Sequence, residues 1–311
     1  MPSHPAAALE ELEPRPTLSD LTLVVPTVGR PVLREVLNSI ARGSRWPSQL
    51  IIVDQSDGDD VANHVDHLAR AGLQIDHVRA ARRGVAAARN RGIERVRTRW
   101  FVINDDDQRV TPDWLQCMHV RLHAHPRAVV TGMVAPESPR VPSTTKDEVA
   151  AVHVRPLLTR DPLFAGNMGT SGDVIAEVGL FDERGPLEGA EDNDWGYRAM
   201  RLGIPIVYAP EVKVLHLDWR DDAGIEETYR RYARAQGAFY GKYLRKGDLF
   251  IAVRAGRELL RGPWLLVRGL ATKDPDLRLW GRADIAGTLP GLIAGVRMPT
   301  AVVTGPDRRQ G

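Results

Sequence analysis

The chain has 311 residues, of which 43% are hydrophobic and 26% are charged, and its formal net charge is +2. This length suffices for one large α/β domain with an appendage or for two small domains. So small a net charge excludes the strong positive field typical of nucleic-acid-binding proteins. The single cysteine, Cys117, excludes an internal disulfide and a cysteine-rich zinc site, and it is typical of a reducing compartment such as the cytoplasm.

The N-terminal part of the chain predicts a lead-in followed by a strand–helix–strand unit. Residues 1–19 begin MPSHPAAALEELEPRP, which is acidic and proline-rich, so we expect a disordered lead-in rather than a signal peptide. Residues 21–25 (LTLVV) predict a first buried strand, and residues 50–53 (LIIV) predict a second. Between them, apolar residues at helical spacing predict a helix that begins near Pro31.

The alternation of strands and helices continues through the middle of the chain. We expect helices at 60–71, at 85–97 and after Pro112, and strands at 75–78, 100–103 and 128–134. This alternation predicts a mostly parallel sheet covered on both faces by helices. Residues 136–162 are polar and proline-rich without periodicity, which predicts a long loop or lid-like insertion.

The last third of the chain changes in composition. Helices are predicted at 173–178 and 191–203, and short strands at 206–208 and 212–216. Beyond Gly224, long helical stretches carry arginines among leucines and aromatic residues. We therefore expect an α/β domain over 20–222 and a helical extension over 223–311. The most apolar stretch, 283–303, contains Asp284 and Arg297, so a membrane-spanning run of about eighteen residues is excluded.

Three consecutive acids, Asp105, Asp106 and Asp107, follow the predicted strand at 100–103. Crowded carboxylates repel one another, so the cluster is costly unless a cation binds there. Hard oxygen ligands suit Mg²⁺ and Mn²⁺, and open α/β sheets place ligands at the carboxyl ends of their strands. The alternative is a solvated acidic turn that caps the next helix.

Other polar residues stand at the ends of predicted elements. Asp54 could accept hydrogen bonds from a nucleobase or ribose, or it could cap a helix. The segment 82–92 (RRGVAAARNRG) combines small residues, which allow close approach, with arginines, which suit phosphate. Glu191 and Asp192 begin a predicted helix, where acids also interact favourably with the helix dipole. His216 ends the last predicted strand and could be a half-buried structural histidine.

Taken in order, these motifs resemble an inverting glycosyltransferase of family 2. The matching segments are VVPTVGRP, IIVDQSDGDD, RRGVAAARNRGI, FVINDDDQRVTPDWL, GAEDNDWGYRAMRLG and VLH. Each is weak alone, but their order and separation between about residues 21 and 220 make a strong joint signal. The basic tail (RRYARAQGAFYGKYLRKGD) also resembles the tails of bacterial members. The resemblance implies the GT-A fold, an α/β architecture with a mostly parallel central sheet, here followed by a helical C-terminal extension.

The resemblance also implies a reaction and its residues. The reaction is a metal-dependent, inverting transfer from a nucleoside-diphosphate sugar to a hydroxyl acceptor such as a cell-envelope glycan, a glycolipid or a metabolite. Asp192 matches the catalytic base, and Asn104 departs from the apolar residue that commonly precedes the acids. The metal, Mn²⁺ or Mg²⁺, would be held by Asp107, His216 and Asp105. Contacts to the nucleotide sugar are implied for Pro26, Thr27, Arg30, Asp54, Arg83, Arg89, Asp105, Asp106 and Glu191.

Two rival functions and two roles for the tail remain open at this point. A nucleotidyltransferase is disfavoured because no glycine-rich phosphate loop follows the first strand, and a non-catalytic sugar-nucleotide- or glycan-binding module is disfavoured by the intact acids. No nucleic-acid partner is expected. The aromatic and basic residues of 229–245 predict an amphipathic helix. It would dock on the anionic inner face of the cell membrane, pack on the catalytic domain, or join a homodimer.

Overall fold

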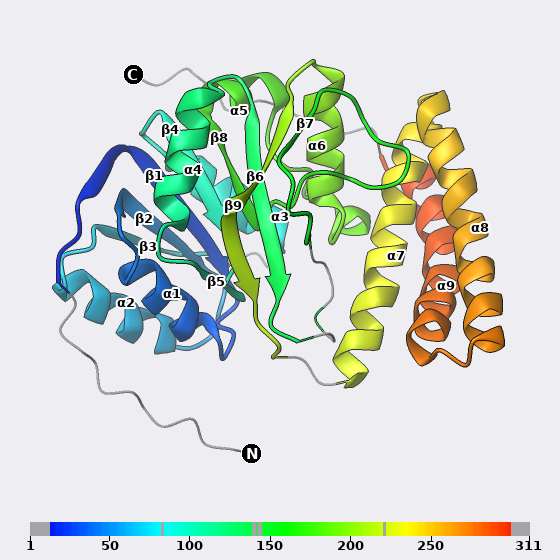
Figure 1. Ribbon diagram of the computed structural model, residues 1–311, viewed down its shortest axis with the longest axis horizontal. Coiled ribbons are helices and arrows are strands. Elements are labelled where there is room, and N and C mark those ends of the chain that lie inside the picture. The colour runs from blue at the N-terminus through cyan, green and yellow to red at the C-terminus, as the bar shows by residue number, and fades with distance from the viewer. Residues whose placement is uncertain (1–12, 82–83, 139–140, 142–144, 220–221, 300–311) are drawn as a thin grey trace.

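The computed structural model describes residues 13–81, 84–138, 141, 145–219 and 222–299, which form a helix-covered sheet with three long helices beside it (Figure 1). The strands are β1 (Thr17–Thr27), β2 (Trp46–Asp54), β3 (Ile75–Arg79), β4 (Trp100–Asn104), β5 (Gln108–Val110), β6 (Val129–Pro136), β7 (Ala151–His153), β8 (Asn167–Ser171) and β9 (Ile206–His216). The helices are α1 (Leu33–Ala41), α2 (Asp60–Arg70), α3 (Val85–Ile93), α4 (Trp114–Ala124), α5 (Gly172–Val178), the short 3₁₀ helix η1 (Gly185–Leu187), α6 (Glu191–Arg201), α7 (Asp222–Leu244), α8 (Leu249–Ala271) and α9 (Pro275–Arg297).

The sheet is parallel in its first half and mixed in its second. Its strand order is β3-β2-β1-β4-β8-β6-β9-β5, with β7 paired to β9. The neighbours β3, β2, β1 and β4 are parallel, as the alternation with helices predicts. Beyond β4, however, β8 runs antiparallel to both β4 and β6, and β5 and β7 run antiparallel to β9.

Two apolar layers hold the helices on the faces of the sheet. Residues 21–25 of β1 are buried on both sides, which is why this part is almost continuously apolar rather than alternating. Leu23 and Val25 pack in one cluster with α1, α2 and α4. Val24 points to the opposite face and packs with α3, α5 and α6. Helices therefore cover both faces, and the carboxyl ends of β1 and β4 are left open for a site.

Several predicted boundaries are wrong. β1 begins at Thr17, which pairs with Trp46, so the strand includes residues assigned to the lead-in, while residues 1–12 lie outside the described part. The helix predicted at 85–97 ends at Ile93. The two strands predicted at 206–208 and 212–216 are one strand, β9, because β6 pairs with both halves across a register shift. The predicted loop at 136–162 contains β7, which pairs with β9.

The C-terminal helices pack tightly on one another and on the α/β part. Phe239, Tyr240 and Tyr243 of α7 are buried in a cluster with α6, η1 and α8, so these aromatic residues face a core and not a membrane. α7 and α9 approach closely: a Cβ added at Gly291 would lie 1.9 Å from the backbone oxygen of Arg234, so glycine is needed there. The packing role predicted for this part of the tail is therefore confirmed for α7.

Candidate active site

A cavity of about 380 Å³ opens where β1 and β4 end and α3 and α6 begin. It collects most of the residues that the sequence predicts for the site. Those that line it are Pro26, Thr27, Arg30, Arg89, Asp105, Asp106, Asp107, Glu191, Asp192 and His216. Arg83 lies outside the described residues.

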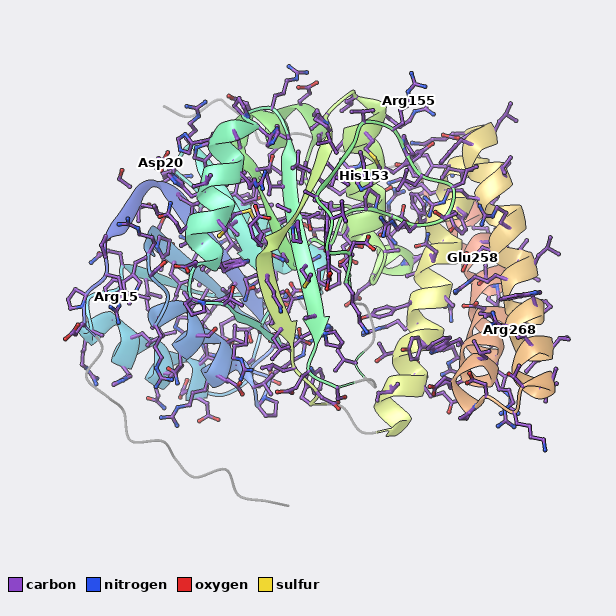
Figure 2. All side chains as sticks on the ribbon, in the orientation of Figure 1. Arg15, Asp20, His153, Arg155, Glu258 and Arg268 are labelled. Carbon is purple, nitrogen blue, oxygen red and sulfur yellow. The ribbon has the colours of Figure 1, made fainter. Side chains whose placement is uncertain are left out.

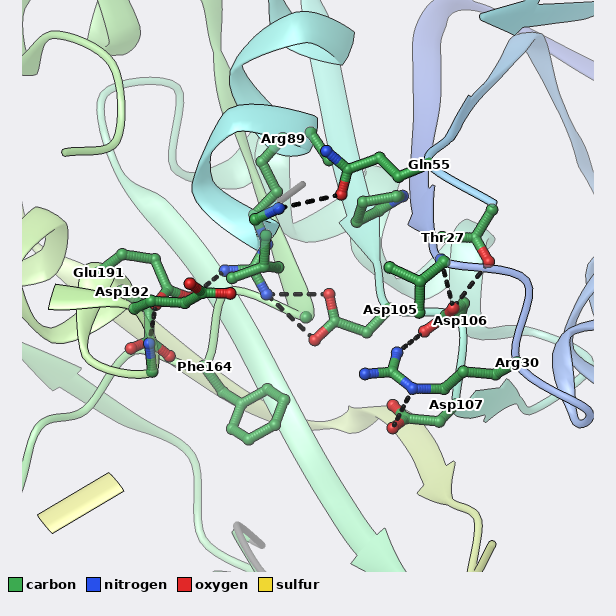
Figure 3. A pocket seen from close by; sticks show the side chains of 18 of the residues that line it. Thr27, Arg30, Gln55, Arg89, Asp105, Asp106, Asp107, Phe164, Glu191 and Asp192 are labelled. Atoms are coloured by element: carbon green, nitrogen blue, oxygen red, sulfur yellow. Dashed lines mark hydrogen bonds and ion pairs between the residues drawn. The ribbon is translucent and has the colours of Figure 1, made fainter. Parts of the chain in front are cut away.

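The acidic turn between β4 and β5 is fixed by a buried asparagine. The side-chain amide of Asn104 donates hydrogen bonds to the backbone oxygens of Asp105 (3.1 Å) and Gln108 (2.9 Å). An apolar residue at this position could not make these bonds, so the departure from the family pattern braces the turn. Gly166 is packed against it, since a Cβ there would lie 2.3 Å from Oδ2 of Asp105. The three acids are held in different directions: Asp105 faces Arg89, whereas Asp106 and Asp107 share Arg30 (Figure 3).

Asp106 ties the acidic turn to the end of β1. It is buried, and it accepts a hydrogen bond from the hydroxyl of Thr27 (2.7 Å) and another from the guanidinium of Arg30. Burial raises the pKa of Asp106 to about 6, although the charge of Arg30 opposes this shift. With these partners in place, Asp106 positions the turn and the Arg30 side chain.

Asp107 and His216 form the part of the site that suits a metal ion. Nε2 of His216 lies 3.6 Å from Oδ2 of Asp107, and the indole N–H of Trp219 donates to the same oxygen at 2.9 Å. Burial works against the charge of Asp107, but the interactions with His216 and Arg30 outweigh it and hold the pKa of Asp107 below its usual value. One carboxylate oxygen and one imidazole nitrogen at this separation fit a divalent cation such as Mn²⁺.

Arg89 links the acidic turn to the start of α6. This buried side chain donates to Glu191 (2.7 Å) and makes two hydrogen bonds to Asp105 (2.9 and 3.0 Å) (Figure 3). Asp105 therefore faces Arg89 in this structure, whereas Arg30 stands beside Asp107. The arrangement places both acids at the start of α6 on the far side of the cavity from Asp107.

Asp192 is the acid of the α6 pair that carries a strongly shifted pKa. Its half-buried side chain lines the cavity next to Glu191. Burial and repulsion by Glu191 raise the pKa of Asp192 to about 7, although the charge of Arg89 opposes the shift. A carboxyl group with a pKa near the operating pH is well suited to accept a proton.

Asp54 does not line the cavity. Its buried carboxylate accepts hydrogen bonds from the backbone and hydroxyl of Ser56 (2.8 and 2.6 Å) and lies 2.9 Å from Nε2 of His77. Burial opposes the charge of Asp54, but the bonds from Ser56 and His77 lower the pKa of Asp54 below its usual value. The neighbouring Gln55 lines the cavity instead, and its side-chain oxygen accepts a hydrogen bond from the backbone N–H of Gly84 (3.3 Å).

Several lining residues have no signal in the sequence. Phe164 and Gly166 come from the connection before β8, and Arg231 and Tyr232 come from α7. Arg231 belongs to a basic, aromatic helix whose sequence predicts docking or packing, and only tertiary packing brings this helix to the cavity. Helix α7 thus supplies one wall of the site.

The comparisons with known proteins agree with the fold. Residues 22–170 match the model of the family described as Glycosyl transferase family 2. The crystal structure of S. aureus TarS is 12% identical, with a TM-score of 0.55, over 85% of this chain and 55% of that one. The mannosyltransferase PcManGT from Pyrobaculum calidifontis, in complex with GDP-Man and Mn²⁺, is 17% identical, with a TM-score of 0.59, over 91% of this chain and 86% of that one. No curated protein sequence matches the chain.

Proposed function

We propose that this chain, a GT-A-fold glycosyltransferase with a family 2 domain over residues 22–170, is a metal-dependent inverting enzyme. It would move a sugar from a nucleoside diphosphate to a hydroxyl group of a glycan, glycolipid or metabolite. One observation carries the proposal. Asp192 and the acidic turn line the same cavity, and Arg89 and Glu191 lie between them. Two further structures, of S. aureus TarS 1-349 in complex with UDP-GlcNAc and with UDP, and the mannosyltransferase with GDP-Man support the donor class.

The donor diphosphate would lie near Asp107, where its negative charge can be met. Asp107 and His216 would hold the divalent ion, whose charge offsets the negative charge that develops on the departing diphosphate. Arg30 and Arg89 add fixed positive charge to the lining of the cavity. The start of α3 also lines the cavity through Gly84, Val85 and Ala88, and the N-terminus of a helix favours phosphate.

The acceptor hydroxyl would approach from the side of α6. Asp192 takes its proton as the oxygen attacks the anomeric carbon of the donor sugar, and the nucleoside diphosphate leaves from the opposite face. A single displacement of this kind inverts the anomeric centre and needs no covalent nucleophile. Glu191 is held by Arg89 and by the backbone N–H of Gly189 (2.6 Å), so it is less free to act as the base.

Replacing Asp107 with asparagine tests the metal requirement. We expect the wild-type protein to turn over one nucleotide sugar from a panel of UDP, GDP and dTDP sugars only when Mn²⁺ or Mg²⁺ is present. The variant should need at least about 100-fold more metal for half-maximal turnover. Changes to residues outside the coordination shell already lower metal affinity by about 10–100-fold. Metal titrations of donor turnover measure this shift, with the exposed Asp113→Asn as the matched control. Equal turnover by the wild-type protein after chelation would overturn the metal-dependent mechanism.

The exposed face of α8 is the part of the extension that suits a membrane surface. Among the described helices, none combines the length and apolarity that a membrane crossing requires. α7 buries its aromatic residues, but α8 exposes an apolar stripe with Arg257 and Arg268 beside it. The stripe consists of Leu249, Val253, Leu260, Trp264, Val267 and Leu270. We propose that α8 lies on an anionic membrane, because an apolar stripe flanked by arginines matches acyl chains and acidic headgroups.

Vesicle flotation tests this docking. The wild-type protein should float with vesicles that contain phosphatidylglycerol and remain behind with pure phosphatidylcholine. Leu260→Asp with Trp264→Asp should abolish flotation, whereas Val120→Asp, an equally exposed apolar position on α4, should not. If the wild-type protein sediments as a dimer that the same double variant splits, and does not float, the face is a homodimer interface and the membrane proposal fails.

A further inference from the structure

A second group of metal-binding residue types lies at the end of the sheet away from the cavity. His119 and His123 are four residues apart in α4, so their side chains share one face of the helix. Asp20 lies in the first half of β1, within the segment where the pairing of β1 with β2 shifts register. Such irregularities re-aim side chains, and Asp20 stands at the edge of the molecule beside α4 (Figure 2).

The three side chains converge on one point. Nε2 of His119 lies 2.8 Å from Oδ1 of Asp20, and Nε2 of His123 lies 3.0 Å from Oδ2. The two Nε2 atoms are 3.1 Å apart, and the three ligand atoms all lie within 4.8 Å of one another. Around a tetrahedral zinc ion with bonds of about 2.1 Å, neighbouring ligand atoms lie about 3.4 Å apart. The three measured separations are shorter than this value, and the two histidines face different oxygens of Asp20, so the side chains would move apart to admit an ion.

We propose that Asp20, His119 and His123 bind one zinc ion, in a site separate from the sugar-transfer cavity. Two imidazoles and one carboxylate suit Zn²⁺, whereas Mg²⁺ and Ca²⁺ prefer oxygen ligands only. Without an ion, Nε2 of each imidazole lies within hydrogen-bond distance of the Asp20 carboxylate. Zinc binding requires both Nε2 atoms in the unprotonated form, so the affinity should fall at acidic pH. The His123 side chain is 46% exposed, so water reaches the site and completes the coordination.

We expect the zinc ion to stabilise the folded protein, because it would connect two elements of the fold. The ion would join the start of β1 to the last two turns of α4, and these two elements belong to the same apolar layer. The ring of His123 also packs against Trp100 at the start of β4, with ring centroids 5.6 Å apart. A bound ion would therefore hold β1 and α4 together at the end of the domain opposite the cavity. It would not contact the donor or the acceptor.

Zinc binding to the metal-free protein tests the proposal directly. Isothermal titration of Asp107→Asn with His216→Ala, in which the cavity ligands are removed, should still show one zinc ion bound. Adding His119→Ala and His123→Ala should weaken that binding by at least about 100-fold, because even partners outside a coordination shell contribute about 10–100-fold. His125→Ala, at the end of the same helix, is the matched control and should bind zinc normally.

Thermal unfolding separates a zinc site from a hydrogen-bonded cluster. In the Asp107→Asn, His216→Ala background, zinc should raise the melting temperature, and adding His119→Ala with His123→Ala should abolish that rise. Asp20→Asn is the milder variant, which preserves the side-chain shape and should lower the zinc response without loss of the fold, as circular dichroism would show. Unchanged zinc affinity in the histidine double variant, or no zinc bound by the wild-type protein, would overturn the proposal.

Discussion

Asp192→Asn is expected to lower kcat by about 10²–10⁴-fold, the usual effect of removing a general base, while donor binding stays within a few-fold of the wild-type value. Asparagine keeps the shape of the side chain and the oxygen that accepts the backbone N–H of Asn193 at 2.8 Å. What it loses is the ability to take the acceptor proton. Steady-state turnover and donor affinity measure the two effects separately, and Asp173→Asn, an exposed acid in the first turn of α5, is the control. Near-normal turnover would remove Asp192 from the mechanism.

The pH dependence of turnover is a second test of the role of Asp192 as the base. With a pKa of about 7, Asp192 is protonated below neutrality. We expect kcat/KM to rise about tenfold per pH unit below that pKa and to level off above it. The Asp192→Asn variant should not show this rise. Because the folded protein raises this pKa from 3.8, the contribution of Asp192 to stability is lost as the pH rises through about 7. The Asn variant should therefore melt higher than the wild type at pH 8.

The sequence pattern predicts elements well where burial alone decides them. Residues 21–25 of β1 and residues 100–103 of β4 are nearly continuous apolar runs, and the helix after β1 shows clear apolar spacing. β8 (NMGTS) has no such pattern, because tertiary contacts decide its place. The side chain of Asn167 accepts from the indole of Trp114 (2.9 Å) and donates to the backbone of Val212 (2.9 Å). Gly169 packs under Met118, where a Cβ would lie 2.9 Å from the sulfur. None of these partners is local in sequence.

The residues of the site also divide into those that the local sequence predicts and those that only tertiary packing brings to the cavity. Acids that follow an apolar strand can be recognised from the sequence, since the end of a strand fixes where they stand. The direction in which each carboxylate points cannot be predicted from the sequence. Asp54, for example, turns toward Ser56 and His77 rather than into the cavity. Arg231 and Tyr232 reach the cavity only because α7 packs over η1 and α6. Side chains on distant segments leave no periodic or motif signal that would place them there.

Lys242 illustrates a tertiary role that its sequence context conceals. In the sequence it is one more cation on the basic face of a helix. In the structure it is buried, and its ammonium group donates to Asp182 (2.9 Å) and to Asp194. Asp194 also accepts the hydroxyl of Tyr243 (2.9 Å) and the guanidinium of Arg198 (3.1 Å). This network binds α7 to the first turns of α6.

Lys242→Met should therefore lower the free energy of unfolding by about 3–5 kcal/mol, because it leaves buried carboxylates without their cation. Urea unfolding, with equal slopes in the two proteins, measures the difference. Lys246→Met, exposed one turn later, should stay within about 0.5 kcal/mol of the wild type. Adding Asp194→Asn to Lys242→Met should recover part of the loss, since one of the unpaired charges is then removed. A loss as small as that of the control would show that Arg184 and Arg198 already neutralise the acids. The loss we expect would make α7, and with it one wall of the cavity, dependent on a single buried lysine.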